Sequence, residues 1–200
     1  GTGLGLAIVK ELAALYGETT PVVNSPQAVA NTLHKYRAGA ILAAAGLPVP
    51  DAFFGRSPRT VQKWTEHLPD DAAHKRTIGT NGRGMSVVSP DDPVGPLIDD
   101  EHAFVQEFLD ASDSRPSDVR VYVVGGEVVG AMRRHAPGGE WRTNVALGGD
   151  VKGITDDLGP EPRRIATEAT SVLDLDVAGV DLMPVDGEWY VLEVNAPAGF

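Results

Sequence analysis

The sequence predicts an α+β fold in two lobes, with mostly antiparallel sheets. Three observations support this fold class: helical periodicity is confined to a few segments, short glycine turns join pairs of strand-like segments, and strands and helices do not alternate regularly. Regular alternation would instead indicate a parallel sheet. We expect a smaller lobe over residues 46–100 and a larger lobe over residues 101–200.

The N-terminal part is predicted to be mainly helical. Residues 5–15 carry apolar side chains at helical spacing and predict one helix, and residues 21–24 predict a short strand. A Ser-Pro pair begins the helix expected over residues 25–45, because serine caps a helix start and proline suits its first turn. A second Ser-Pro pair follows a strand expected over residues 52–54 and begins a helix over residues 57–68.

Strands dominate the rest of the chain. Residues 73–77 and 85–88 are predicted strands on either side of a glycine-rich loop at residues 79–84, and residues 103–109 predict the next strand. The remaining expected elements are a hairpin over 119–132 around Gly125 and Gly126, a helix over 161–175, and a hairpin over 178–194 around Asp186 and Gly187.

The composition is that of a globular protein with an acidic balance. The 200 residues are 42% hydrophobic and 22% charged, with a net charge of −11 and no cysteine. No apolar stretch is long enough to cross a membrane, so we expect a soluble, cytoplasmic protein without membrane partners. The acidic charge argues against nucleic-acid binding, and abundant acidic residues with little lysine are typical of a protein from a halophile. Disulfides and thiol catalysis are excluded.

Alternation along the last predicted strand, residues 189–195, separates a core face from an open face. Leu192 and Val194 are predicted to enter the core, whereas Glu193 and Asn195 point the other way. The strand therefore presents a carboxylate and an amide on one side.

The loop length of this hairpin decides which residue faces Glu193. With a three-residue loop at residues 186–188, Asp181 lies opposite Glu193 and Leu182 lies opposite Leu192. A two-residue loop would pair apolar with charged faces, so the pattern favours three residues. Two carboxylates and an amide within about 5 Å of each other suit Mg²⁺, because a cation between them relieves their repulsion. A solvated, exposed hairpin face is the simpler alternative.

Two lysines are candidate phosphate ligands. Lys75 precedes the loop at residues 79–84, whose glycines allow backbone N–H groups to approach phosphate oxygens. This loop matches neither the P-loop nor the dinucleotide-binding pattern, and a plain hairpin turn also explains it. Lys35 projects from the helix expected over residues 25–45, and a solvated surface lysine is the simpler interpretation.

Arginines accompany the central hairpin. Arg120 and Arg142 lie on or beside it, and arginine is expected where phosphoryl or acyl-phosphate charge develops, because its guanidinium offers parallel donors. Arg133, Arg134 and His135 form a short basic cluster that could bind an anionic substrate, although a solvated strand face explains this cluster equally well.

Six blocks of sequence, in order, resemble the ATP-grasp superfamily, and in particular its RimK-type α-L-glutamate ligase branch. The resemblance runs from about residue 5 to residue 200. The blocks are His34-Lys35-Tyr-Arg with Ala45-Gly-Leu-Pro-Val-Pro50; Lys75 through Gly84; Val105-Gln-Glu-Phe108; Asp118-Val-Arg-Val-Tyr-Val-Val-Gly125; Trp141-Arg-Thr-Asn144 with Gly148-Gly149; and Asp176-Val-Ala-Gly-Val-Asp181 with Leu192-Glu-Val-Asn-Ala196.

The resemblance implies an ATP-grasp fold, in which two α+β lobes grip ATP, and it implies a role for each candidate residue. Lys35 and Lys75 would contact ATP phosphates, Glu107 and Phe108 the adenine, and Asp118 the region of the ribose. Arg142, Thr143 and Asn144 would lie against the phosphates, with Arg120 and Arg142 as the catalytic arginines. Asp181, Glu193 and Asn195 would bind two Mg²⁺ or Mn²⁺ ions.

The chemistry implied by the resemblance is ATP-dependent formation of an amide bond. A substrate carboxylate attacks the γ-phosphate, metals and Arg142 neutralise the transferred group, and an amine displaces phosphate from the acyl-phosphate. The implied partners are ATP, an amino acid such as glutamate, and a carboxylate acceptor that is a peptide, protein or small molecule. A homo-oligomer is compatible with this interpretation. A non-catalytic ATP-binding module of a larger assembly is the alternative.

Compared with that family, we expect the chain to be a fragment. Residues 1–24 match only the last helix and strand of the domain before the ATP-grasp lobes, and residues 25–45 match the helix that connects them. The usual segment beyond the Glu-x-Asn strand has no counterpart. Residues 1–10 also resemble the second glycine box of sensor histidine kinases, but the other boxes of those kinases are absent, so we assign this segment to the closing helix of the preceding domain.

Overall fold

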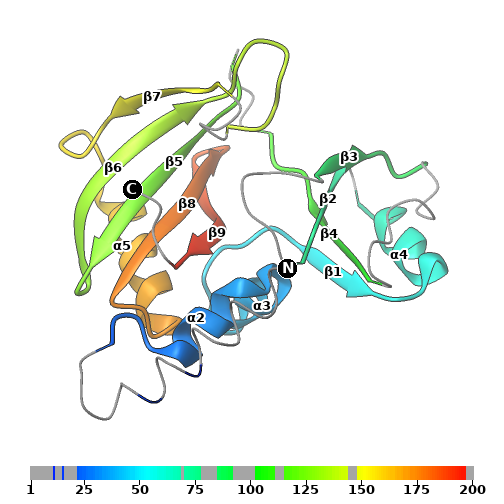
Figure 1. Cartoon of the computed structure of the whole chain (residues 1–200). Helices are drawn as coiled ribbons and strands as arrows, with labels where there is room; N and C mark the ends of the chain where they lie inside the picture. Colours follow the sequence, from blue (N-terminus) through cyan, green and yellow to red (C-terminus); the bar gives the residue numbers. More distant parts are fainter. Residues whose placement is uncertain are drawn as a thin grey trace.

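The computed structural model describes residues 11, 15, 22–68, 70–77, 85–91, 102–110, 115–143 and 148–196. All strand pairs found there are antiparallel and form two sheets, which confirms the α+β class (Figure 1). The elements are α2 (Pro26–Leu33), α3 (Lys35–Ala44), β1 (Ala52–Gly55), α4 (Pro58–Thr65), β2 (Ala72–Lys75), β3 (Ser86–Val88), β4 (Ala103–Glu107), β5 (Ser117–Val124), β6 (Glu127–His135), β7 (Asp150–Gly153), α5 (Pro160–Val172), β8 (Val177–Val185) and β9 (Glu188–Asn195).

The smaller sheet has the strand order β1-β4-β2-β3. It has a small core of its own, in which Val61 of α4 packs with Ala103 and Val105 of β4, and the ring of Phe53 stacks on Trp64. The expected lobe boundary at residues 100 and 101 is therefore wrong, because β4 pairs with β1 and β2 in this sheet. Strand pairing is a long-range property that the local pattern of β4 did not reveal.

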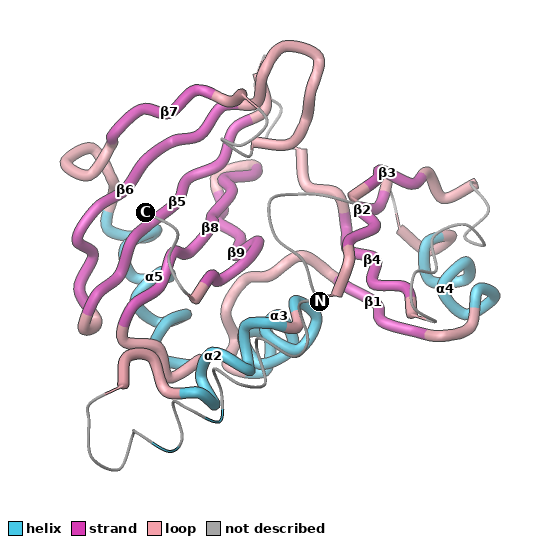
Figure 2. Tube along the Cα trace, in the orientation of Figure 1, coloured by secondary structure: helices cyan, strands magenta, loops and turns pink. Residues whose placement is uncertain are grey.

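The larger sheet has the strand order β7-β6-β5-β8-β9 and carries the main core. Val119, Val121 and Val123 of β5 are fully buried in one cluster with Ile165 and Ala169 of α5. Figure 2 shows α5 against this sheet, with α3 on the side that faces the smaller sheet. Burying these apolar faces holds the lobe together, so the opposite face of β5 is left for polar side chains.

The helix expected over residues 25–45 is two helices, broken at His34. The backbone of His34 is extended (φ −101°, ψ 101°), and its Nδ1 accepts a hydrogen bond from the backbone N–H of Arg37 at 3.4 Å. The backbone N–H of Lys35 donates to Thr77 O at 3.0 Å instead of continuing the first helix. A contact with the smaller lobe thus overrides the local helical pattern.

The segment before these helices also differs from expectation. Residues 22–24 form no strand, and the Asn24 side chain instead exchanges two hydrogen bonds with the backbone of Val177, each 2.7 Å long. The predicted cap is confirmed, because Ser25 Oγ accepts a hydrogen bond from Ala28 N at 3.1 Å. The helix expected over residues 5–15 lies outside the described residues, apart from Glu11 and Leu15, which are helical.

The last hairpin confirms the facing carboxylates but not the expected loop. Asp181 of β8 pairs directly with Glu193 of β9. The turn contains two residues, Asp186 and Gly187, rather than three, and both have positive φ angles, 50° and 85°. Such a turn matches the right-handed twist of the two strands, whereas the predicted three-residue loop was chosen from side-chain patterning alone.

A β-bulge beside Asp181 reconciles the short turn with the facing carboxylates. Leu182 pairs with Val191 and not with Leu192, because one extra residue is inserted on β9. Val191, 2% exposed, takes the core position predicted for Leu192, which is only half-buried. The bulge shifts the alternation by one residue and so changes which side chain enters the core.

The central hairpin agrees with the prediction. Gly125 and Gly126 form its two-residue turn with positive φ angles, 57° and 80°. The edge strand β7 was not predicted; all four of its residues are exposed, so it lacks the apolar alternation that identifies a strand. Among the described residues, no helix is long and apolar enough to span a membrane.

Candidate functional site

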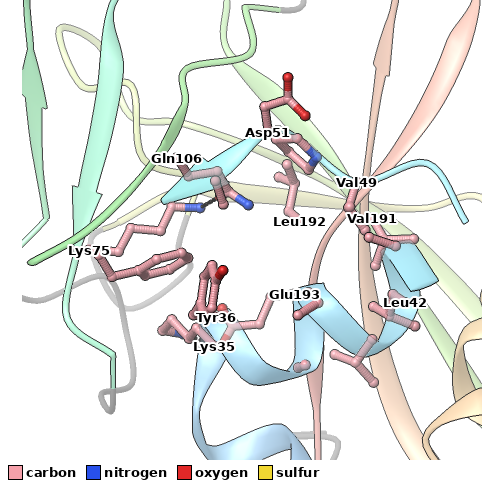
Figure 3. Close-up of a pocket in the computed structure, with 18 of the residues that line it drawn as sticks. Lys35, Tyr36, Leu42, Val49, Asp51, Lys75, Gln106, Val191, Leu192 and Glu193 are labelled. Carbon is pink, nitrogen blue, oxygen red and sulfur yellow. Dashed lines mark hydrogen bonds and ion pairs between the residues drawn. The ribbon is translucent and has the colours of Figure 1, made fainter. Parts of the chain in front are cut away.

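A pocket of about 320 Å³ lies where the helix α3 and the strand β9 meet the smaller sheet. Five polar or aromatic side chains on its wall come from four elements: Lys35 and Tyr36 from α3, Lys75 from β2, Gln106 from β4 and Glu193 from β9 (Figure 3). Lys35, Lys75 and Glu193, which are far apart in the sequence and were predicted separately, thus converge on one space.

Both pocket lysines are engaged. Lys35 Nζ forms an ion pair with Glu193 Oε1, and Lys75 Nζ donates a hydrogen bond to Gln106 Oε1. Burial lowers the pKa of Lys75 to about 8; the positive charge of Lys35 adds to this effect and the negative charge of Glu193 opposes it. The pocket therefore contains two cationic groups near one carboxylate, and one of these groups is easily deprotonated.

Asp181, beside the pocket, is held by two arginines. Arg120 binds it through two nitrogens, with Nε 2.7 Å from Oδ1 and Nη2 2.8 Å from Oδ2. Arg134 Nη2 lies 3.0 Å from the same Oδ2. Burial acts to raise the pKa of Asp181, but the hydrogen bonds and charges of both arginines outweigh it and hold the pKa below its usual value.

Arg134 extends this network to a second buried carboxylate. Its Nε and Nη2 donate to the two oxygens of Asp118, at 2.7 and 2.5 Å, and Thr143 Oγ1 donates to Asp118 Oδ2 at 2.7 Å. Burial raises the pKa of Asp118, and the hydrogen bond from Arg134 offsets part of that rise. The sequence predicted Arg134 only as part of a basic cluster for an anionic substrate or on a solvated strand face, but Arg134 is 3% exposed and lies opposite Asp118 in the β5–β6 register.

The donor set around Asp181 fits a small cation. The Asn195 amide nitrogen lies 3.4 Å from Asp181 Oδ2, so the amide oxygen of Asn195 is available to another ligand. The two carboxylates already attract Lys35 and Arg120 in the structure, and together with the amide oxygen they offer three hard oxygen atoms. The described residues contain no group of three or more His, Cys, Asp or Glu side chains suited to a metal.

Two expected adenine ligands lie at the end of β4. The Glu107 backbone N–H donates to Asp51 O at 2.8 Å, and the ring of Phe108 meets Trp141 edge-on with centroids 5.3 Å apart. Neither Glu107 nor Phe108 lines the pocket, although their neighbour Gln106 does. Gln106 was overlooked because a single glutamine in a buried strand has no distinctive pattern.

Arg142, an expected phosphate ligand, is engaged within its own loop. Glu140 accepts hydrogen bonds from Arg142 Nε at 3.0 Å and Nη2 at 2.6 Å. These bonds lower the pKa of Glu140 to about 2. Thr143 is buried on Asp118, as described above, whereas Asn144 and the glycine-rich loop at residues 79–84 lie outside the described residues.

Comparison with known proteins identifies close sequence relatives. The RimK-like ATP-grasp domain family matches residues 32–200. A probable alpha-L-glutamate ligase of Legionella pneumophila (strain Corby) is 33% identical over 205 residues, which cover 99% of this chain and 65% of that protein. A second one, from Haemophilus influenzae (strain ATCC 51907), is 30% identical over 203 residues, with coverage of 99% and 65%. The chain thus spans just under two thirds of the length of these relatives.

Solved structures agree on the fold. The ATP-grasp ligase PsnB, complexed with a minimal precursor, Mg and ADP, superposes with a TM-score of 0.74 at 27% identity, covering 97% of this chain and 60% of that one. The D-cycloserine synthetase DcsG gives the same TM-score at 19% identity, covering 94% and 70%, and shows the fold alone. Two antiparallel sheets with a basic and acidic pocket between them thus have the ATP-grasp architecture, and the chain belongs to the RimK-like ATP-grasp domain family.

Proposed function

We propose that this chain forms the ATP- and metal-binding part of a carboxylate–amine ligase that adds glutamate to an acceptor. The observation that carries the proposal is the pocket in which Lys35, Lys75 and Glu193 converge, with Asp181 paired to Glu193 on the neighbouring strand. Cationic groups for phosphates and oxygen ligands for Mg²⁺, side by side, match the needs of Mg-ATP. The names of the relatives support glutamate as the added amino acid.

Two Mg²⁺ or Mn²⁺ ions are proposed to bind Asp181, Glu193 and Asn195, and the bound metal would supply neutralisation of the transferred phosphoryl charge. The residues of the chain would position the phosphates: Lys35 from α3 and Lys75 from β2 would donate to phosphate oxygens. No protein nucleophile is needed, because the substrate carboxylate itself attacks the γ-phosphate and the amine then displaces phosphate.

Binding of Mg-ATP requires exchange of ionic partners in this site. Lys35 is bonded to Glu193, and Arg120 to Asp181, so each acid and each base already has a partner. A metal would take the two carboxylates, and the phosphates would then take Lys35 and Arg120. The charges balance before and after this exchange, which keeps the cost of burying ATP low.

The roles of the remaining candidates follow from their contacts. Phe108, beside Trp141, is proposed to contact the adenine together with Glu107, and Arg142 and Asn144 to reach the phosphates from their loop. Both oxygens of Asp118 are used by Arg134, with Thr143 also bonded to one of them. We therefore propose that Asp118 and Thr143 support the metal-binding carboxylate rather than bind the nucleotide.

A direct test measures ADP and phosphate release by the purified chain. A ligase should release both only when glutamate and a carboxylate acceptor, such as a short peptide, are supplied together. The double variant Glu193→Ala/Asn195→Ala should lose this release, whereas Lys152→Met, an exposed residue of β7, should keep it. Because the acidic composition is typical of proteins from strong salt, each assay should be run over a range of KCl concentrations.

Nucleotide binding without any acceptor-dependent release would favour the alternative, a non-catalytic ATP-binding module. Mg-ATP affinity and turnover that are unchanged in the double variant would overturn the proposed metal site. Because the chain covers 65% of the probable alpha-L-glutamate ligase of Legionella pneumophila, a second arm assays that full-length relative in parallel.

A further inference from the structure

We propose that Arg134 is a positioning residue that orients the Asp181 carboxylate for a metal ion without itself contacting substrate. This inference rests on the proposed metal site and assigns a role to a side chain that sequence reasoning left in an exposed basic cluster. Its evidence is the geometry of one buried guanidinium between two carboxylates from neighbouring strands.

The side chain of Arg134 is firmly fixed by its contacts. Two of its nitrogens meet the two oxygens of Asp118 at 2.7 and 2.5 Å, and the side chains of this pair are 3% and 4% exposed. Thr143 Oγ1 holds Asp118 from another side at 2.7 Å. A bidentate, buried arginine pair of this kind has little freedom to rotate. The Arg134 guanidinium is therefore held rigidly against the larger sheet.

Arg134 and Arg120 bind Asp181 in different ways. Arg120 covers both oxygens of Asp181, but its side chain is 17% exposed, compared with 3% for Arg134, so Arg120 is the less enclosed of the two. Arg134 touches only Oδ2, at 3.0 Å. When a metal displaces Arg120, Oδ1 becomes free, whereas Oδ2 is still held. Arg134 thus fixes the rotation of the carboxylate and leaves one oxygen for the metal.

Arg134 also has an electrostatic effect. Asp118 and Asp181 are both buried on the same face of the larger sheet, and Arg134 is the cation bonded to both. Without it, two buried carboxylates would repel each other, and one would turn away or take up a proton. Partners that orient a metal ligand typically change metal affinity by about 10- to 100-fold when they are altered.

The test uses Arg134→Lys, which keeps the positive charge but loses the planar fork. Mn²⁺ binding in the presence of ADP is measured from the free-ion signal in electron paramagnetic resonance. We expect the Mn²⁺ dissociation constant to rise by about 10-fold or more, while the affinity for metal-free ADP stays the same. A purely structural role would lower the melting temperature without changing Mn²⁺ affinity in the folded protein.

The matched control is Val121→Ala, which removes buried methyl groups from the opposite face of the neighbouring strand β5. It should lower the melting temperature but leave the Mn²⁺ dissociation constant unchanged. If Arg134→Lys does not fold, the paired variant Asp118→Asn/Arg134→Gln removes both charges together, and it should weaken Mn²⁺ binding in the same way.

The variant Asp181→Asn tests the proposed metal site separately from the positioning role of Arg134. If it abolishes Mn²⁺ binding while Arg134→Lys, or the paired variant, binds as tightly as the wild type, the positioning role is overturned and the metal site stands. If wild-type protein binds no Mn²⁺ with ADP, or Asp181→Asn binds it normally, the proposed metal site itself fails and the role of Arg134 fails with it.

Discussion

Lys75 gives the pocket a dependence on pH. Its pKa of about 8 in the ligand-free protein must rise when phosphate binds, because the anion stabilises the ammonium. Below pH 8 the lysine is protonated before and after binding, so affinity is flat. Above pH 8 binding must take up a proton, and ATP affinity should fall by up to about tenfold per pH unit. Calorimetry at pH 8.5 in two buffers of different ionisation enthalpy should reveal this proton uptake.

The control for Lys75 is its replacement by methionine, which fills a similar volume without a charge. Lys75→Met should bind ATP more weakly at pH 7 and show no proton uptake at pH 8.5. Wild-type affinity that stays constant between pH 7 and pH 9.5 would contradict a phosphate-binding role for Lys75.

Lys35 should weaken metal binding but strengthen nucleotide binding. In the ligand-free protein it occupies Glu193, so Lys35→Met should release that carboxylate and strengthen Mn²⁺ binding measured without nucleotide. The same change removes a phosphate donor and should weaken ATP binding by about 10-fold, the size of one charged hydrogen bond. Both constants can be measured by titration calorimetry.

Lys152→Met removes the same charge from the exposed edge strand β7 and should alter neither constant. A Lys35→Met variant in which Mn²⁺ affinity falls together with ATP affinity would show that the ion pair does not compete with the metal.

The sequence predicted the facing pair Asp181 and Glu193 from alternation, and the pairing holds because the bulge at Leu192 offsets the shorter turn. The sequence did not predict that Arg134 binds Asp181, because this contact needs β6 to lie two strands away from β8 on the same face. Contacts between non-adjacent strands depend on the order of strands in the sheet, which local patterns do not encode.

At the level of elements, the two-residue turn of the last hairpin can be tested by substitution. Gly187 has a φ of 85°, where a side chain clashes with the backbone. Gly187→Ala should therefore lower the free energy of unfolding by about 1–2 kcal/mol, measured by urea denaturation. Because this turn holds the register of Asp181 and Glu193, Mn²⁺ affinity should weaken as well.

Gly153→Ala is the matched control, since Gly153 lies at the edge of the same sheet with open space around it and no positive φ. The free energy of unfolding of the Gly153→Ala variant should not fall. Equal destabilisation by both substitutions would mean that the turn conformation is not what makes Gly187 important.

The elements most accurately predicted are those defined by local rules: the Ser25 cap, the Gly125-Gly126 turn and the helix α5. The helix break at His34 was not predicted because it depends on Thr77, far away in the chain. The bulge at Leu192 was not predicted because the alternation of side chains does not reveal an extra residue. Both errors lie beside the pocket, where Lys35 and Glu193 are positioned by these same irregularities.

For the whole molecule, the two separate cores predict that the larger lobe folds alone. Among the described residues between 48 and 118, none is a buried member of the main core, although the partly buried Val49 packs against it. Replacing residues 52–106 by a short glycine-serine linker should leave a protein with a cooperative thermal transition, followed by circular dichroism. It should bind no ATP, because Lys75 and Gln106 are removed. A non-cooperative transition would mean that the smaller sheet stabilises the larger one.

Two lobes with antiparallel sheets were predicted correctly from composition and turns, but the boundary between them was not. Strand β4 carries a buried pattern that suits either sheet, and only its pairing with β1 and β2 decides. A strand can be recognised from its own residues. Its lobe can be assigned only when the strands that pair with it are known.

The chain enters the smaller lobe at Ala52 and leaves it at Glu107, on the neighbouring strands β1 and β4. The two crossings therefore lie side by side, joined by the bond from Glu107 N to Asp51 O. In mechanical terms the paired crossings form a hinge line, and a rotation of the smaller lobe about it would also have to change the bond from Lys35 N to Thr77 O. Such a rotation changes the distance between Lys75 on one lobe and Glu193 on the other while both cores stay intact, so the pocket can open and close with little unfolding.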